Sequence, residues 1–179
     1  NSKNVVHLDL KPDNIFISDG KIKIGDFGNS LYDNVDKYNN VLSYYHNELS
    51  FDTNLIDPDN KDYITPLYRP PELLVEGRAK AGKFSDIWSL GCVLYFLLYK
   101  KHLWPNKENC SDSFVSDSDF LVFLSEYIGA PPLDNHRVEY PVLEYGNGDK
   151  KFSEFDEIFK EMFTWLPEKR ITAKKLKKN

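Results

Sequence analysis

The sequence predicts a mainly α-helical domain with one small β-hairpin. The segment IFIS, Asp19-Gly20, KIKI contains two short apolar runs around a turn dipeptide. Asp-Gly is a strong hairpin signal because it tolerates the positive φ values of a type I′ turn. Farther along, apolar residues recur at helical spacings, and one continuous run, IWSLGCVLYFLLY, has the length of a buried core helix.

Composition narrows the classes of function. The 179 residues are 41% hydrophobic and 15% aromatic, as in one ordinary folded domain. A net charge of −5 argues against a general nucleic-acid or anionic-membrane binder, and the longest apolar run is short of the roughly 20 residues that span a bilayer. Cys92 and Cys110 form neither a disulfide framework nor a metal-ligand pattern. We therefore expect an intracellular protein, cytoplasmic or nuclear, without nucleic-acid or membrane partners.

The hairpin predicts which polar residues come together. Pairing around the Asp-Gly turn places Ser18 opposite Lys21 and continues until Asn14 faces Gly25 at the open end. Asn14 and Asp26 then emerge side by side, because cross-strand and diagonal neighbours lie only about 5–8 Å apart. This spacing suits one shared cation.

The next segments are a polar stretch, a proline-rich segment and the buried helix. Residues 29–63 have no sustained period and are predicted to be a long loop or insert. TPLYRPPELL should be extended and irregular before a short helix starts near Glu72. Ser85 is the expected N-cap of the buried helix, Asp86 adds negative charge at its positive end, and Gly91 permits close packing against a neighbour.

The remaining part of the chain predicts three further helices. Residues 117–128 and 152–165 have apolar side chains at helical spacings. Pro167 should interrupt the chain, and Thr172 should cap a final helix through Lys178. The sequence contains no internal repeat, so one domain is expected over residues 1–179.

Four polar residues near the start form a set suited to phosphoryl transfer. Asp9 can accept a hydroxyl proton and Lys11 is a cation for phosphate. Asn14 and Asp26 are oxygen donors of the kind that Mg²⁺ prefers. The ordered set is more specific than any one of its members.

These motifs resemble the C-terminal lobe of eukaryotic protein kinases. HLDLKPDN (residues 7–14) resembles the catalytic loop, DFG the metal-binding start of the activation segment, and PPELL the motif that closes it. SDIWSLG is similar to the family's central buried helix. The resemblance implies a protein-kinase-like C-lobe of α+β type with the N-terminal lobe missing. Residues 1–179 would be a partial kinase domain with a catalytic loop, an activation segment carrying the insert 29–63, and C-lobe helices.

The resemblance implies a role for each residue of the site. Asp9 would orient and deprotonate the substrate hydroxyl, and Lys11 would contact the γ-phosphate of ATP. Asn14 and Asp26 would each bind Mg²⁺. The lysine two residues after the aspartate resembles the serine/threonine type, and Thr65 resembles the threonine that links the substrate loop to the catalytic loop.

Four more residues resemble structural positions of the family. His7 would be a packed structural residue, and Asp86 would hold the backbone of the catalytic loop. Glu72 and Arg170 would form a buried ion pair. Breaking such a pair by removing one partner costs about 3–5 kcal/mol.

Two short motifs resemble the group of cyclin-dependent and mitogen-activated kinases. TPLYRPPE places Arg69 in the substrate loop, and EYIGAPP follows later in the chain. Kinases of this group often prefer proline after the target residue. Leu8 departs from the family, which usually has an arginine there to gather a phosphorylated activation loop. We therefore expect acidic substitutions of Ser or Tyr between residues 29 and 63 to raise activity less than tenfold.

The leading hypothesis is a serine/threonine kinase acting on protein hydroxyls with ATP and Mg²⁺, with a protein substrate and a regulatory subunit as partners. No glycine-rich loop or ATP-binding lysine precedes Val5, so the chain alone is expected to be inactive. One alternative is a pseudokinase or truncated binding module. Another is a small-molecule kinase of the aminoglycoside or choline type, but those families lack a DFG followed by a PPE-terminated loop.

Overall fold

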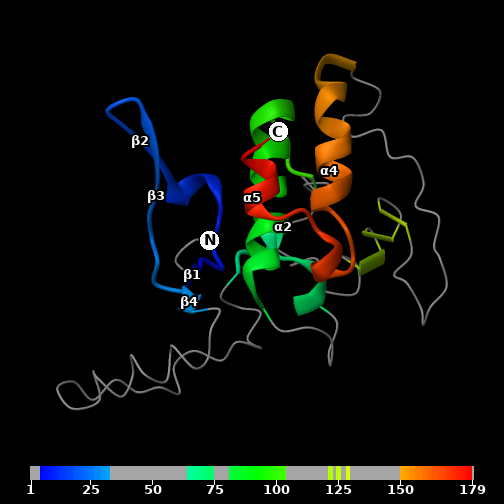
Figure 1. Ribbon diagram of the computed structural model, residues 1–179, viewed down its shortest axis with the longest axis horizontal. Helices are drawn as coiled ribbons and strands as arrows, with labels where there is room; N and C mark the ends of the chain where they lie inside the picture. Colours follow the sequence, from blue (N-terminus) through cyan, green and yellow to red (C-terminus); the bar gives the residue numbers. More distant parts are fainter. Residues whose placement is uncertain are drawn as a thin grey trace, which may run out of the picture.

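The computed structural model describes residues 5–32, 64–74, 81–103, 121, 122, 124, 125, 128, 129 and 150–178. Its α-helices are α2 (Lys83–Tyr99), α4 (Asp156–Met162) and α5 (Ala173–Leu176). Figure 1 shows α2 in the middle, with α4 beside it and a β-hairpin standing apart on the other side. The prediction of several helices with a small antiparallel sheet is confirmed.

The hairpin has the predicted register. Strand β2 (Ile15–Ser18) pairs with β3 (Lys21–Ile24) along its whole length, and the first residue of one strand faces the last residue of the other. Asp19 and Gly20 in the turn both have positive φ, of 54° and 68°. Two consecutive positive φ values define the type I′ turn that matches the twist of the strands.

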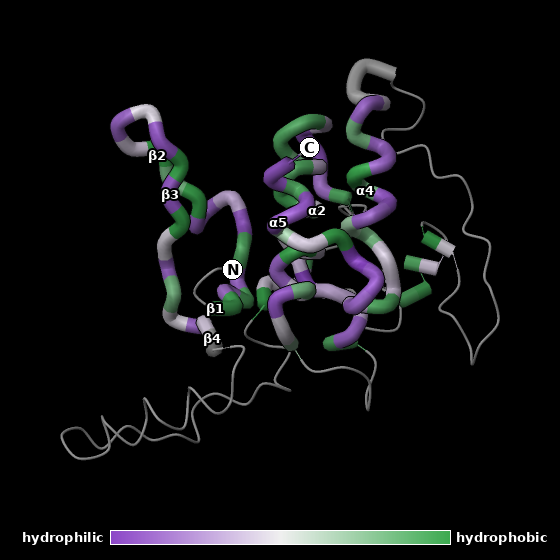
Figure 2. Tube along the Cα trace, in the orientation of Figure 1, coloured by the Kyte–Doolittle hydropathy of each residue, from purple (hydrophilic) through white to green (hydrophobic). Residues whose placement is uncertain are grey.

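One face of this hairpin is apolar and is exposed near the turn, whereas Ile15 at its other end packs against the main core. Ile15 pairs with Ile24, and Ile17 pairs with Ile22, so these four side chains lie on the same face. We call this set the isoleucine face. Ile17 and Ile22 are 80% and 75% exposed, and Figure 2 shows hydrophobic residues alternating with hydrophilic ones along both strands.

A second strand pair corrects the expected loop. Strand β1 (Val5–Val6) pairs in antiparallel fashion with β4 (Leu31–Tyr32), so residues 31 and 32 of the predicted loop form a strand. The pairing brings the segment after the hairpin back beside the start of the described chain. Residues 33–63 of the predicted insert lie outside the described part of the chain.

The central helix α2 begins two residues before the predicted cap. Gly82 is its N-cap, and Ser85 is the third residue of the helix, so the assignment of Ser85 as N-cap is wrong. Ser85 still satisfies the helix start from inside, because its Oγ accepts a hydrogen bond of 3.1 Å from the Gly82 backbone N–H. The helix ends at Tyr99, where Lys100 adopts a left-handed φ of 57°.

The main core surrounds α2. Trp88, Phe159 and Leu124 are completely buried in one cluster. The predicted close packing at Gly91 is confirmed, because a Cβ at this position would lie 2.8 Å from the Phe163 ring. A side chain here would therefore push α4 and its following turn away from α2.

The helix predicted over residues 152–165 is shorter. A 3₁₀ segment η6 (Lys150–Phe155) leads into α4, which ends at Met162. The Ile171 backbone N–H donates to the Glu161 carbonyl at 2.9 Å, so the following segment uses an acceptor of the last helical turn. Of the helix predicted over 117–128, the described residues 121, 122, 124, 125 and 128 are helical, and the other residues of this range lie outside the described part.

The prolines form tight turns. The segment predicted to be extended contains the 3₁₀ turns η4 (Pro66–Tyr68) and η5 (Pro71–Leu73), and Pro167 begins the similar turn η7 (Pro167–Lys169). Each has proline at its first position. A backbone N–H at this position would have no acceptor within the turn, so proline, which lacks this N–H, costs no hydrogen bond there.

The prediction that Thr172 caps the last helix is confirmed. Its Oγ1 accepts a hydrogen bond of 3.2 Å from the Lys175 backbone N–H at the start of α5. The helix ends at Leu176, two residues before the predicted end at Lys178.

Candidate active site

The loop that carries Asp9 is attached to α2 by hydrogen bonds. Asp86, in the first turn of α2, accepts hydrogen bonds from two consecutive backbone N–H groups, those of His7 at 2.8 Å and Leu8 at 2.9 Å. Leu8 has a left-handed φ of 65°, which a leucine adopts only at a cost. Burial raises the pKa of Asp86, and the two N–H donors partly offset this. The helix thus fixes an otherwise unfavourable turn immediately before Asp9.

Asp9 lies at the centre of a polar network. Lys11 Nζ donates to its Oδ2 at 2.7 Å, and Thr65 Oγ1 donates to its Oδ1 at 2.7 Å. Lys11 Nζ also donates to Thr65 Oγ1 at 3.1 Å. The loop 64–72, which we call the substrate loop, is therefore joined to the catalytic loop at Asp9 itself.

These contacts keep Asp9 ionised. Burial alone would raise the pKa of Asp9, but the hydrogen bonds from Lys11 and Thr65 and the charge of Lys11 outweigh it and hold the pKa below its usual 3.8. A carboxyl group with a lowered pKa stabilises the fold above its unfolded pKa, and this stabilisation is lost as the pH falls through the lowered value. Near neutral pH Asp9 is a carboxylate that can accept a proton.

Asn14 lies directly against Asp9. Its Nδ2 donates to the Asp9 carbonyl at 2.8 Å and to Asp9 Oδ2 at 3.2 Å. Because the amide nitrogen makes both bonds, the amide oxygen Oδ1 is the atom left to bind a cation. Asn14 is buried, with 5% of its surface exposed.

Asp26 follows the other strand of the same hairpin. The Gly25 backbone N–H donates to the Asn14 carbonyl at 2.9 Å, so Asn14 and Gly25 face one another as predicted. Asp26 is exposed and has a left-handed φ of 57°. An amide oxygen and a carboxylate are hard donors that fit Mg²⁺. Among the described residues no group of three His, Cys, Asp or Glu side chains could hold a metal.

His7 connects the catalytic loop to the segment of Asp26. Its Nδ1 accepts from the Asp9 backbone N–H at 3.2 Å, and its Nε2 donates to the Gly25 carbonyl at 2.9 Å. These two bonds require the neutral ring with the proton on Nε2. The ring also packs against Phe27, with centroids 4.8 Å apart. His7 thus has the buried, packed position that its structural assignment expects.

The substrate loop is folded by Arg69. Its Nε and Nη2 donate to the Ile64 carbonyl at 3.2 and 3.0 Å. Ser89 on α2 adds a contact that the sequence analysis missed, because its Oγ donates to the Tyr68 carbonyl at 2.8 Å. The only signal in the sequence that could have indicated this role is that Ser89 lies about one helical turn after Asp86.

The end of the substrate loop is anchored by the expected buried ion pair. Arg170 Nη1 donates to Glu72 Oε1 at 2.9 Å, and Arg170 Nη2 donates to Oε2 at 2.5 Å. Ser85 Oγ donates to the same Oε1 at 2.9 Å, a contact that the sequence analysis also missed. The guanidinium carbon of Arg170 lies 5.0 Å from the centroid of the Trp88 ring. The pair is therefore enclosed by hydrogen bonds and an aromatic face.

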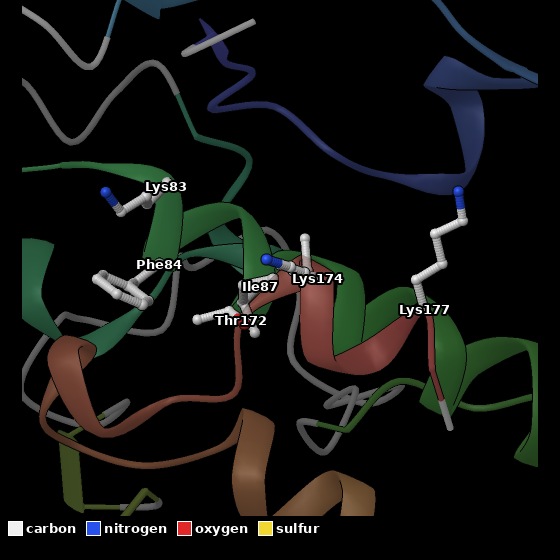
Figure 3. Close-up of a pocket in the computed structure, with 7 residues that line it drawn as sticks. Lys83, Phe84, Ile87, Thr172, Lys174 and Lys177 are labelled. Atoms are coloured by element: carbon white, nitrogen blue, oxygen red, sulfur yellow. The ribbon is translucent and has the colours of Figure 1, made fainter. Parts of the chain in front are cut away.

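A cavity lies elsewhere, between the first turns of α2 and α5 (Figure 3). It is lined by Lys83, Phe84, Ile87, Thr172, Ala173, Lys174 and Lys177. Asp9, Asn14 and Asp26 are not among these residues, so the cavity is separate from the candidate active site. No helix in the described part of the chain has both the length and the apolar character needed to cross a membrane.

Comparisons with known proteins agree with this geometry. The sequence pattern of the protein kinase domain matches residues 1–179. A probable serine/threonine-protein kinase of Dictyostelium discoideum is 40% identical over 64% of the chain and 25% of that protein. Cyclin-dependent kinase 2 of Caenorhabditis elegans is 28% identical over 96% of the chain and 43% of that protein. The chain therefore spans less than half the length of these relatives.

A solved structure shares the fold. The CAK complex from Chaetomium thermophilum bound to ATP-gamma-S contains a chain that matches with a TM-score of 0.65 and 24% identity. The match covers 98% of this chain and 51% of that one.

Proposed function

Because the chain belongs to the protein kinase domain family, we propose that it carries the catalytic loop of a serine/threonine kinase that phosphorylates protein hydroxyls with ATP. The single observation that carries this proposal is the network at Asp9. A carboxylate with a lowered pKa lies between Lys11 and Thr65 and against Asn14. Relatives whose names say serine/threonine-protein kinase support the substrate class.

The proposed mechanism assigns each contact a task. Asp9 orients the substrate hydroxyl and takes its proton as the hydroxyl oxygen bonds to the γ-phosphorus and the bond to the β-phosphate oxygen breaks. Lys11 Nζ, which Asp9 and Thr65 hold by hydrogen bonds, would offset negative charge on the transferred group. Asn14 and Asp26 would hold Mg²⁺, which offsets negative charge on the phosphates when it is bound. Thr65 keeps the substrate loop in register with Asp9.

We propose a protein substrate and a regulatory subunit as partners. The cyclin-dependent kinases among the relatives support a regulatory subunit, since their names state a dependence on another protein. The exposed position of Asp26 and the half-buried position of Lys11 support access of a large substrate to the site. A pseudokinase or binding module is the alternative outcome.

Replacing Asp26 by alanine tests the proposed function. The complete protein that carries this chain is incubated with MgATP and a generic basic protein, and phosphate incorporation is measured. We expect the variant to lose at least about 90–99% of the activity, since removing only the outer-shell support of a metal ligand typically costs about 10–100-fold.

The matched control for Asp26 is Asp19→Ala, an exposed aspartate with left-handed φ at the opposite end of the same hairpin. It should leave the activity unchanged. A wild-type protein that incorporates no phosphate, or an Asp26→Ala variant as active as Asp19→Ala, would contradict the proposed function.

The contacts of Arg69 also support a preference for proline after the target residue. The Ile64 carbonyl already accepts two hydrogen bonds from Arg69, so it is poorly placed to accept another from a peptide N–H. Proline has no backbone N–H to leave without a partner. A peptide with proline at this position would therefore lose less binding free energy than a peptide with alanine, because only alanine leaves an N–H without a partner.

Three peptides that differ only after the target serine test this preference. They carry proline, alanine or N-methylalanine at that position. We expect kcat/KM to be about tenfold higher for proline and N-methylalanine than for alanine, as expected for about 1.4 kcal/mol from one unpaired donor. Equal values for alanine and N-methylalanine would show that the missing N–H is not the cause.

A further inference from the structure

The cavity between the first turns of α2 and α5 has a positively charged rim. Three lysines line it, Lys83 from the start of α2, and Lys174 and Lys177 from α5 and its C-cap position. Figure 3 shows Lys83 and Lys177 toward opposite sides of the cavity, with Lys174 between them. Among the described residues that line the cavity there is no aspartate or glutamate. We call this site the lysine cavity.

The apolar wall of the lysine cavity is formed by Phe84 and Ile87 of α2 and is held in place by the core. Ile87 is 4% exposed and packs with Met162 and Ile171 in a buried cluster. The Phe84 carbonyl accepts a hydrogen bond of 2.9 Å from Arg170 Nη1. The cavity has a volume of about 510 Å³, within the range of about 300–1,000 Å³ that is typical of ligand pockets. The site is therefore formed before a ligand arrives.

The polar groups on the α5 side of the cavity differ in whether they already have a partner. Lys175 Nζ donates to Glu161 Oε1 of α4 at 2.6 Å, and Lys175 does not line the cavity. Lys174 and Lys177 are exposed, and no acidic side chain in the described part of the chain pairs with them. Thr172 Oγ1 accepts from the Lys175 backbone N–H at 3.2 Å, so its own proton is left to donate to an anion. Two ammonium groups and one hydroxyl thus face a negatively charged ligand.

The lysine rim and the apolar wall together select one class of ligand. The chain has a net charge of −5, so an extended anionic surface, such as a membrane or a nucleic acid, would be repelled outside the cavity. A second copy of the chain would bring the same negative charge. A small inorganic anion would leave Phe84 and Ile87 uncovered. A short acidic peptide with one apolar side chain can contact both the lysines and the apolar wall.

We propose that the lysine cavity is a docking site for an acidic segment of a partner protein. The segment places one apolar side chain against Phe84 and Ile87 and its carboxylates beside Lys174 and Lys177. Exposed apolar surface is covered in this way, and the positive rim fixes the sign of the partner's charge. The site is separate from Asp9, Asn14 and Asp26, and its occupation requires neither ATP nor a metal.

Three fluorescein-labelled pentapeptides test the chemistry of the ligand. One has phenylalanine between four glutamates, the second has glycine between four glutamates, and the third has phenylalanine between four glutamines. Fluorescence anisotropy with the complete protein at low ionic strength measures their dissociation constants. We expect the first peptide to bind at least about fivefold more tightly than either of the others, because only the first has both the charge and the apolar side chain. Equal binding of the two glutamate peptides would indicate a simple anion site, and either that result or no binding of the first peptide would overturn the proposal.

A double variant, Lys174→Ala with Lys177→Ala, tests the location of the site. We expect it to bind the phenylalanine–glutamate peptide about fivefold more weakly than the wild type, since it lacks two exposed ion pairs with the peptide. The matched control is Lys101→Ala with Lys169→Ala, which removes the same charge from two exposed lysines that do not line the cavity. The control should stay within about twofold of the wild type. An equal loss in both double variants would show that only the total charge matters, and would overturn the proposal.

Two further measurements test other occupants of the cavity. Sedimentation equilibrium of the complete protein should give the same mass for the wild type and for Lys174→Ala with Lys177→Ala, and unlabelled phosphatidylserine vesicles should leave the labelled peptide bound. A dimer that the double variant converts to a monomer would identify a second copy as the occupant, and displacement by vesicles would identify a lipid surface. Either result would overturn the proposal. None of these measurements uses ATP, so their failure is distinguishable from a failure of the proposed function.

Discussion

Replacing Asp9 by asparagine is expected to lower kcat for phosphate transfer by about 10³-fold, in the middle of the 10²–10⁴ range typical of a general base. Asparagine has nearly the same shape but cannot take the substrate proton. Its amide would also face Lys11 Nζ, which now donates to Asp9 Oδ2 at 2.7 Å. Steady-state kinetics with a peptide substrate and MgATP measure the loss.

The matched control for Asp9 is Asp13→Asn in the same loop. Asp13 is exposed, whereas Asp9 is buried, and the control should remain within twofold of the wild-type kcat. The thermal unfolding of both variants separates a chemical loss from a loss of folded protein. An Asp9→Asn variant that is folded and within tenfold of wild type would contradict the role of Asp9 as proton acceptor.

Replacing Arg170 by methionine is expected to lower the free energy of unfolding by about 3–5 kcal/mol, because it leaves the Glu72 carboxylate buried without its partner. The Arg170 side chain is 0% exposed and that of Glu72 is 2% exposed. Arg170 also donates to the carbonyls of Phe84 at 2.9 Å and Thr164 at 3.0 Å. Denaturant unfolding of the complete protein measures the change.

Two further variants separate the ion pair from packing. Lys160→Met removes an exposed partner of Glu157, and such surface pairs contribute only about 0.2–1 kcal/mol. The double variant Glu72→Leu with Arg170→Met removes both buried charges and should be more stable than Arg170→Met alone. If the double variant were the less stable of the two, the stranded carboxylate would not be the cause.

The local parts of this molecule were predictable from the sequence. The Asp-Gly turn fixes the hairpin register within a few residues, and that register places Asn14 opposite Gly25. The long apolar run predicts the central helix, and Thr172 predicts where the last helix starts. In each case the signal and the structure it specifies lie within a few residues of each other.

The parts that depend on distant contacts were not predictable. The two-residue strands β1 and β4 are too short to show a period, and they form because the chain returns beside itself. The sequence predicts Ser85 as the N-cap of α2, but the Ser85 hydroxyl donates to the Glu72 carboxylate and accepts a hydrogen bond from the Gly82 N–H. The role of Ser89 also depends on where the proline-rich turns pack, which no local pattern specifies.

The isoleucine face has a consequence for handling the protein. It belongs to a two-stranded sheet, whose strands each have an unpaired edge among the described residues. Exposed apolar surfaces next to unpaired strand edges favour aggregation at high protein concentration. Preparations of the polypeptide by itself should therefore scatter light at concentrations where a version with threonine at Ile17 and Ile22 stays clear.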